Sequence, residues 1–247
     1  MHVLVVGNVH SASIQDFFRE LLHPDHSVSV YVVVLHPMPP SDHILDIMAE
    51  PEREGRITYI QGSPMHSKDL IRGHIHSADG CFILTNKLTR SPEAEDASAM
   101  LTALGIKKHV MAHGAHDINL YMQLIKPESK RHLMATMPPE MSLTVVCTEQ
   151  LTMNLLSMNV VCPGLNTMLF NLMASDDSGD PMTDNFMLTS GDRLEDQRWY
   201  QEYRRGKGFE IYRTSLSKAF ALIPFYLAAD VVYRQTSAMM FGLELSD

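Results

Sequence analysis

The segment His2-Val3-Leu4-Val5-Val6-Gly7 gives the first indication of the fold. A short, mostly uncharged run that is rich in valine and ends on glycine is typical of a strand buried on both faces of a parallel sheet. The residues that follow place apolar side chains at helical spacing, namely Ile14, Phe17, Phe18, Leu21 and Leu22. A buried strand followed by an amphipathic helix is the repeating unit of an α/β fold.

The same alternation continues through the first 148 residues. Strands are predicted over residues 3–6, 28–35, 57–60, 81–84, 120–125 and 143–147. Helices are predicted over the apolar stripe after the first strand and over residues 42–49, 92–104 and 128–134. Strands that alternate with helices predict an α/β domain with a Rossmann-like, doubly wound, mainly parallel sheet.

The remaining 99 residues have a different character. Residues 149–175 are helical in pattern but contain Pro163-Gly164, so they are predicted to form a helical hairpin that links two lobes. Residues 176–247 are predicted to be an acidic connector followed by a small α+β C-terminal lobe, with helices near 199–203 and 225–233 and strands near 209–214 and 243–245. The abrupt ends predict a domain truncated from a longer protein.

Composition narrows the class of protein. The 247 residues are 45% apolar, which excludes a disordered chain, and the net charge of −9 disfavours nucleic acid as a partner. Three cysteines are too few for a disulfide framework and favour a reducing, cytosolic compartment. No signal peptide is visible, and no apolar stretch approaches the ~20 residues that cross a bilayer.

A dinucleotide site is not expected. The turn after the first strand reads Gly7-Asn8-Val9-His10-Ser11-Ala12, which keeps only the first glycine of the G-x-G-x-x-G motif. The second strand ends on Leu35-His36, where an acidic residue would hold the ribose. Because the phosphate loop and the G-x-S-x-G nucleophile motif are also missing, we expect no NAD and no enzyme.

Metal sites have two weak signals in the sequence. The pairs His74-x-His76 and His113-x-x-His116 lack a nearby cysteine or carboxylate at a known spacing, which favours ordinary surface histidines over a metal site. Residues 176–187 fail the EF-hand pattern at its sixth and twelfth positions. A calcium site would therefore have to be assembled from distant segments.

Nine segments spread over almost the whole chain resemble the first RCK (regulator of K⁺ conductance) domain of Slo-family, large-conductance calcium-activated potassium channels. The segments occur in the same order as in that domain. They are residues 2–7, 17–23, 35–36, 59–63, 69–70, 77–87, 94–98, 164–169 and 210–212. Residues 121–128 and 145–147 resemble the sodium-activated branch of the family more, and Asp96-Ala97-Ser98 the calcium-activated branch.

This resemblance implies a cytoplasmic domain of a membrane-embedded channel. Such domains join other RCK domains, the second of the same subunit and those of neighbouring subunits, in a tetrameric gating ring that pulls on the pore domain through a linker. It also implies a regulatory Ca²⁺ between the two lobes, held by the carboxylates of Asp25 and Glu210 and the main-chain carbonyls of Asp176 and Gly208. Oxygen ligands of this kind suit calcium.

The sequence also departs from the family pattern. The two glutamates of the family's interfacial magnesium site are replaced by Tyr31 and Thr58, so no Mg²⁺ site is expected. Two alternatives stay open. One is a structural or Na⁺-responsive RCK domain without its own calcium site, and the other is a soluble Rossmann-type, nucleotide-dependent enzyme.

Overall fold

The computed structural model describes residues 1–9, 13–23, 29–51, 53–113, 118–136, 142–173, 198–207, 211–212 and 214–243. The chain forms two compact units, residues 1–208 and residues 209–247, and each is treated by itself below. Among the described residues, no helix combines the length and apolar character that a membrane span requires.

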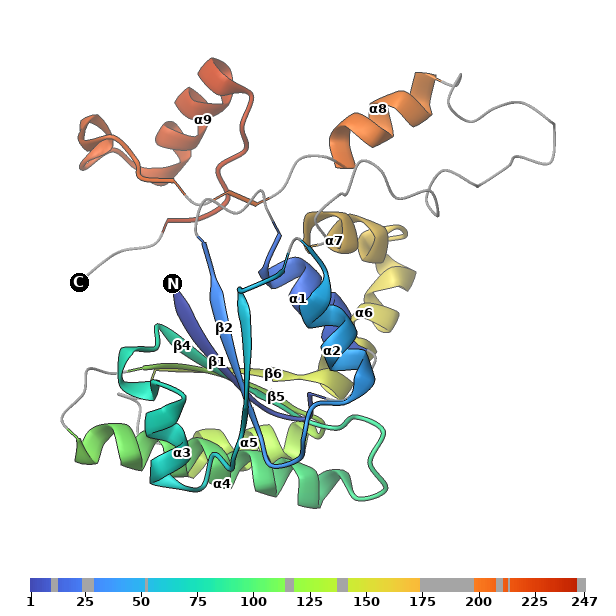
Figure 1. Cartoon of the computed structure of the whole chain (residues 1–247). Helices are drawn as coiled ribbons and strands as arrows, with labels where there is room; N and C mark the ends of the chain where they lie inside the picture. The colour runs from blue at the N-terminus through green and yellow to red at the C-terminus, as the bar shows by residue number, and fades with distance from the viewer. Residues whose placement is uncertain are drawn as a thin grey trace. The chain divides into compact units, whose positions relative to one another are not determined.

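A six-stranded sheet forms the centre of the first unit (Figure 1). Its strands are all parallel and run in the order β3-β2-β1-β4-β5-β6. Their bounds are β1 (His2–Gly7), β2 (Tyr31–His36), β3 (Ile57–Gln61), β4 (Gly80–Leu84), β5 (Asn119–Leu124) and β6 (Leu143–Cys147). All six predicted strands and the doubly wound, Rossmann-like α/β fold are confirmed.

Helices cover both faces of the sheet. They are α1 (Ser13–Leu21), α2 (Asp42–Ala49), α3 (Ser67–Arg72), the short 3₁₀ helix η1 (Ile75–Ser77), α4 (Pro92–Ala112) and α5 (Pro127–Thr136). Figure 1 shows α1 and α2 on one face and α4 and α5 on the other. The alternation of strand side chains explains this division: Val3 and Val5 pack with residues of α1 and α2, whereas Leu4 and Val6 pack with residues of α3 to α5.

The helix α4 is longer than its sequence pattern predicts. The sequence pattern predicts an end at Leu104, and the next residue is Gly105. The helix continues to Ala112 because Ile106 and Val110, on its next turns, are buried in the core against the sheet. Burial of two large aliphatic side chains outweighs the ~1 kcal/mol that a glycine costs inside a helix. The six-residue α3 was not predicted.

Two helices follow the sheet, over the residues for which the sequence predicts a helical hairpin. The helices α6 (Thr148–Val161) and α7 (Leu165–Met173) are separated by Pro163-Gly164, and Gly164 has a φ of +88° that favours glycine. The helix α8 (Arg198–Lys207) contains the segment predicted as helical near residue 199.

The described part of the second unit contains η3 (Lys218–Phe220) and α9 (Phe225–Thr236). The predicted α9 is confirmed. The strand predicted over 209–214 is not formed at its described residues Ile211, Tyr212 and Thr214, and Leu243 of the last predicted strand is also outside regular structure. A strand needs a partner for its backbone groups, and the described residues of this unit provide none.

Candidate functional site

The four predicted calcium ligands lie outside the described residues. Asp25, Asp176, Gly208 and Glu210 are therefore located only by their positions in the chain. By those positions, Glu210 belongs to the second unit and the other three residues to the first. The calcium site stays a prediction.

The structure does describe both flanks of the segment that carries Asp25. Arg56 Nη1 donates a hydrogen bond to the carbonyl of Leu22 at 2.9 Å, and Arg56 Nε donates to the carbonyl of Val30 at 3.4 Å. Leu22 follows α1 and Val30 precedes β2, so one guanidinium contacts the backbone on each side of the segment. The backbone of Arg56 is itself paired, because its carbonyl accepts the N–H of Val32 at 2.8 Å. Arg56 thus links the end of α1 to the start of β2.

The two positions that correspond to the family's magnesium ligands lie on neighbouring strands. Tyr31 begins β2 and Thr58 is the second residue of β3, and both are exposed. Hydroxyl side chains provide no carboxylate for Mg²⁺, which prefers carboxylate and phosphate oxygens. The absence of a magnesium site stays a prediction that these residue types support.

At the carboxyl edge of the sheet, the structure explains Gly7 by packing. Gly7 has a φ of +91°, and a Cβ atom there would lie 2.1 Å from the carbonyl oxygen of Leu84. The next residue, Asn8, donates its N–H to that same carbonyl at 2.8 Å. The single glycine of the degenerate nucleotide motif is therefore required by the close approach of β1 to β4, whether or not a nucleotide binds.

At the same edge of the sheet, side-chain oxygens accept hydrogen bonds from backbone N–H groups. Glu95 Oε1 accepts the N–H of Asn86 at 2.8 Å, and Gln123 Oε1 accepts the N–H of Thr85 at 3.3 Å. In doubly wound folds this edge, between β1 and β4, is where a dinucleotide binds. A carboxylate there disfavours phosphate, which supports the expectation that no NAD binds.

The buried thiols are poor nucleophiles. Burial raises the pKa of Cys81 to about 12, so its thiol stays protonated at neutral pH. Cys147 is also buried, and its Sγ donates to the carbonyl of Ile125 at 3.2 Å. Both residues are thus suited to packing rather than to covalent catalysis.

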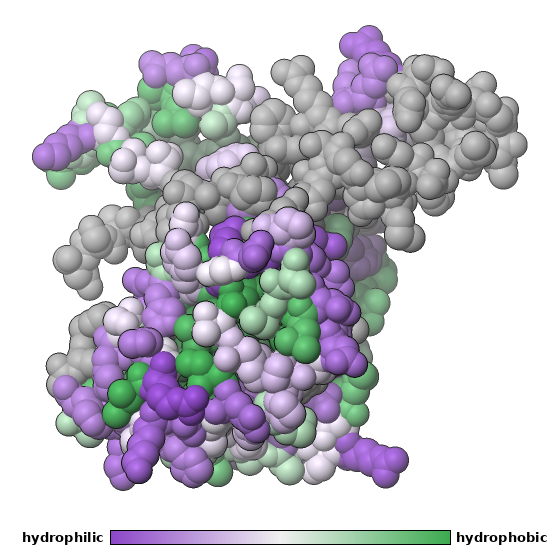
Figure 2. Space-filling view, viewed as in Figure 1, coloured by the Kyte–Doolittle hydropathy of each residue, from purple (hydrophilic) through white to green (hydrophobic). Residues whose placement is uncertain are grey.

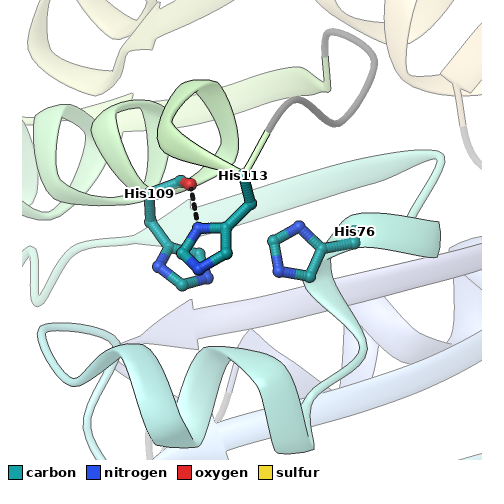
Figure 3. A group of neighbouring side chains, drawn as sticks. All are labelled: His76, His109 and His113. Carbon is teal, nitrogen blue, oxygen red and sulfur yellow. Dashed lines mark hydrogen bonds between the residues drawn. The ribbon is translucent and has the colours of Figure 1, made fainter.

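Three histidines from separate segments come together beside α4 (Figure 3). His76 lies on η1, His109 in the last turn of α4, and His113 at the C-terminal cap of that helix. Three ring nitrogens, one from each histidine, all lie within 4.8 Å of one another. We call His76, His109 and His113 the histidine cluster.

Spacing in the sequence groups the histidines differently. It pairs His74 with His76 and His113 with His116, and His116 lies outside the described residues. His109 was missed because the helix was expected to end at Leu104. In the observed helix, His109 and His113 are four residues apart, so their side chains lie one turn apart on the same face. This i, i+4 spacing is the sequence signal that could have revealed the pair.

The α6–α7 hairpin exposes large apolar side chains. Neither helix has a buried residue, and Met153 is 63%, Leu156 57% and Phe170 62% exposed. Figure 2 shows hydrophobic residues, in green, at the surface on the side where Figure 1 places these helices. A concentration of apolar surface on one element is typical of an interaction site.

The chain matches two families in succession. Residues 1–137, more than half of the chain, match the calcium-activated potassium channel slowpoke-like RCK domain. Residues 143–243 match the calcium-activated BK potassium channel alpha subunit.

Curated relatives extend the similarity over the entire chain. The calcium-activated potassium channel slowpoke of Drosophila melanogaster is 30% identical over 99% of this chain, and slo-1 of Caenorhabditis elegans is 28% identical over 100%. The chain spans about a fifth of each relative, 19% and 20% of their lengths.

A solved structure shares the fold. The human SLO3 gating ring superposes with a TM-score of 0.66 at 20% identity, covering 95% of this chain and 38% of that one. The six-stranded parallel sheet, the order of the helices and the match to residues 1–137 together give the identification. This chain belongs to the slowpoke-like RCK domain family of calcium-activated potassium channels.

Proposed function

We propose that this chain is a cytoplasmic, calcium-responsive regulatory domain of a potassium channel, and that it acts as part of a gating ring. The family matches that cover residues 1–137 and 143–243 are the observation that carries the proposal. The relatives are calcium-activated potassium channels, and the structure that shares the fold is a gating ring.

In this proposal Ca²⁺ is bound by the side chains of Asp25 and Glu210 and by the main-chain carbonyls of Asp176 and Gly208. Two carboxylates and two carbonyls are hard oxygen ligands, and water fills the remaining positions of a six- to eight-coordinate ion. The Arg56 hydrogen bonds to Leu22 and Val30 support the role of Asp25, because they hold both flanks of its segment to the sheet.

Glu210 and Asp25 belong to different units of the chain, so an ion bound by both carboxylates favours conformations that bring them together. Such a ligand changes the pore only through its different affinity for the closed and open states. A coupling of about 1–3 kcal/mol per site, repeated in four subunits, is sufficient for a steep response.

The partners in this proposal are other RCK domains, and the α6–α7 hairpin is the surface that meets one of them. Each large apolar side chain that moves from water into an interface contributes roughly 1.5–3 kcal/mol. The exposure of Met153, Leu156 and Phe170 supports this role, since an isolated domain gains nothing from presenting them to water.

The function is tested in a full-length channel that carries this chain, by recording the open probability as a function of cytoplasmic calcium. Asp25→Ala is expected to shift the calcium response to higher concentration, whereas Asp46→Ala, which removes an exposed acid of α2, leaves it unchanged. An unchanged response in Asp25→Ala contradicts the calcium assignment. A channel whose response follows sodium instead of calcium supports the Na⁺-responsive alternative.

A further inference from the structure

The histidine cluster joins two connections of the sheet. His76 lies in the connection from β3 to β4, and His109 and His113 lie at the end of the connection from β4 toward β5 (Figure 3). Ring centroids are 5.0 Å apart for His76 and His109, 5.1 Å for His76 and His113, and 4.3 Å for His109 and His113. Three imidazoles from two distant segments thus face one point at the amino-terminal edge of β4 and β5.

The tautomer of His113 is set by its hydrogen bond. His113 Nδ1 lies 2.8 Å from the carbonyl oxygen of His109, and a carbonyl can only accept, so Nδ1 carries the proton. The lone pair of His113 is therefore on Nε2, which is free to bind a metal. Metal-binding histidines usually donate the N–H of the ring nitrogen that does not bind the metal to a carbonyl or carboxylate. This hydrogen bond fixes both the tautomer and the orientation of the ring.

The other two rings have buried nitrogen atoms that lack partners. His109 Nε2 and His76 Nδ1 are inaccessible to solvent and form no hydrogen bond with the described residues. A buried nitrogen without a partner is costly, and a bound ligand removes that cost. Burial, and then the neighbouring His113 and His76, lower the pKa of the His109 imidazole.

We propose that His76, His109 and His113 bind one divalent first-row transition-metal ion, with zinc as the reference ion. Imidazole suits zinc, copper and nickel, whereas calcium and magnesium prefer oxygen, so this site differs in chemistry from the predicted calcium site. Three histidines complete three positions of a tetrahedral zinc ion and leave the fourth to water or to an external ligand.

The distances require a small rearrangement on binding. Two nitrogens bound to one tetrahedral zinc are roughly 3.3 Å apart, given Zn–N bonds of ~2.0–2.1 Å. The cluster's nitrogens lie within 4.8 Å of one another, so the rings must approach. His109 is fixed by burial and His113 by its hydrogen bond to the His109 carbonyl, while His76 is half-buried, which leaves the His76 side chain able to turn toward them.

Binding would cross-link η1 to the C-terminal end of α4. Since these segments flank β4, an ion shared between them stabilises the folded first unit and resists separation of α4 from the β3–β4 connection. A channel domain with this site would respond to a transition metal independently of calcium.

The site is tested on the metal-free chain by titration with ZnCl₂, followed by calorimetry and by the melting temperature. We expect wild type to bind one zinc ion tightly, and the Kd for zinc to be at least ~10-fold higher in His76→Gln and in His113→Gln. Even changes to residues that only contact a metal ligand have effects of this order. Both residues have solvent-accessible side chains, so the variants are expected to melt like wild type without metal.

Two controls make the result specific. His132→Gln removes an exposed histidine of α5 outside the cluster and should bind zinc like wild type. Excess CaCl₂ should not displace the zinc. Equal zinc affinity in wild type, His76→Gln and His113→Gln, or no binding to wild type at 100-fold excess over the protein, overturns the proposal.

Discussion

The carboxylate of Asp96 accepts the backbone N–H of Ile125 at 2.8 Å, across the gap between α4 and the end of β5. Its second oxygen accepts the N–H of Lys126 at 2.9 Å. Asp96 is completely buried, and Ile125 and Lys126 form the link between β5 and α5. One acidic side chain therefore joins three elements of the first unit.

Replacing Asp96 tests this link. Asp96→Ala leaves two donors without their acceptor, at a cost of about 1–3 kcal/mol each, and should lower the free energy of unfolding by about 2–6 kcal/mol in urea denaturation. Asp96→Asn keeps one acceptor oxygen and should cost less. Glu93→Ala, at an exposed acid of the same helix, should change stability by no more than about 0.5 kcal/mol. Equal stabilities for the two alanine variants would contradict this role.

Alanine substitutions at Gly7 and Gly55 distinguish the cost of a steric clash from the cost of backbone strain. Both have positive φ, +91° and +73°, but a Cβ at Gly7 meets the Leu84 carbonyl at 2.1 Å whereas a Cβ at Gly55 has no atom within 4 Å. Gly55→Ala is expected to cost about 1–2 kcal/mol from the left-handed conformation alone. Gly7→Ala should cost at least ~1–3 kcal/mol more, because β1 and β4 must move apart. Similar losses for the two variants would show that the approach of these strands is not tight.

Asp69 gives the first unit an acid-sensitive contact. The N–H of Ser63 donates to Asp69 Oδ2 at 3.0 Å and Arg72 Nη1 donates to Oδ1 at 3.0 Å, and these contacts lower the pKa of the Asp69 carboxyl. A lowered pKa means that the ionised carboxylate stabilises the folded state above the unfolded value near 3.8, and that this stability is lost as the pH falls through the lower folded value.

The measurement is the free energy of unfolding between pH 5 and pH 2. Asp69→Asn cannot ionise and should lose stability less steeply than wild type below about pH 4. Asp46→Asn, at an exposed acid of α2, should follow the wild-type curve. If Asp69→Asn also follows the wild-type curve, the Ser63 and Arg72 contacts do not favour the ionised carboxylate.

The α6–α7 hairpin predicts self-association. In sedimentation velocity, the wild-type chain should form a dimer or larger species as its concentration rises, because buried apolar surface favours the complex. Changing Met153 and Leu156 together to glutamate should restore the monomer, whereas Asn154→Glu, at an exposed polar residue of the same helix, should not. Wild type that stays monomeric, or a double variant that associates like wild type, would argue against this interface.

The central strands β1 and β4 could be predicted from sequence because each is a short apolar run with buried side chains on both faces, so hydrophobicity alone marks them. The order β3-β2-β1-β4-β5-β6 is the one that parallel crossovers of this kind commonly adopt. The end of α4 could not be predicted in the same way. Whether Gly105 ends a helix depends on the burial of Ile106 and Val110, which is a property of the tertiary structure.

The histidine cluster was beyond sequence reasoning for the same reason. His76 is 33 positions before His109, and only the packing of η1 beside α4 brings the two rings together. The predicted calcium ligands came from the family resemblance alone, because Asp25 and Glu210 form no local motif that periodicity or spacing can detect.

The melting temperature of this chain reports whether it binds calcium through Asp25 and Glu210. A ligand that binds only the folded state adds about 2.7 kcal/mol of stability at 100 times its Kd. Millimolar calcium, compared with chelator, is therefore predicted to raise the melting temperature of wild type but not of Asp25→Ala or Glu210→Ala. An equal rise in all three proteins, or no rise in wild type, would contradict the account.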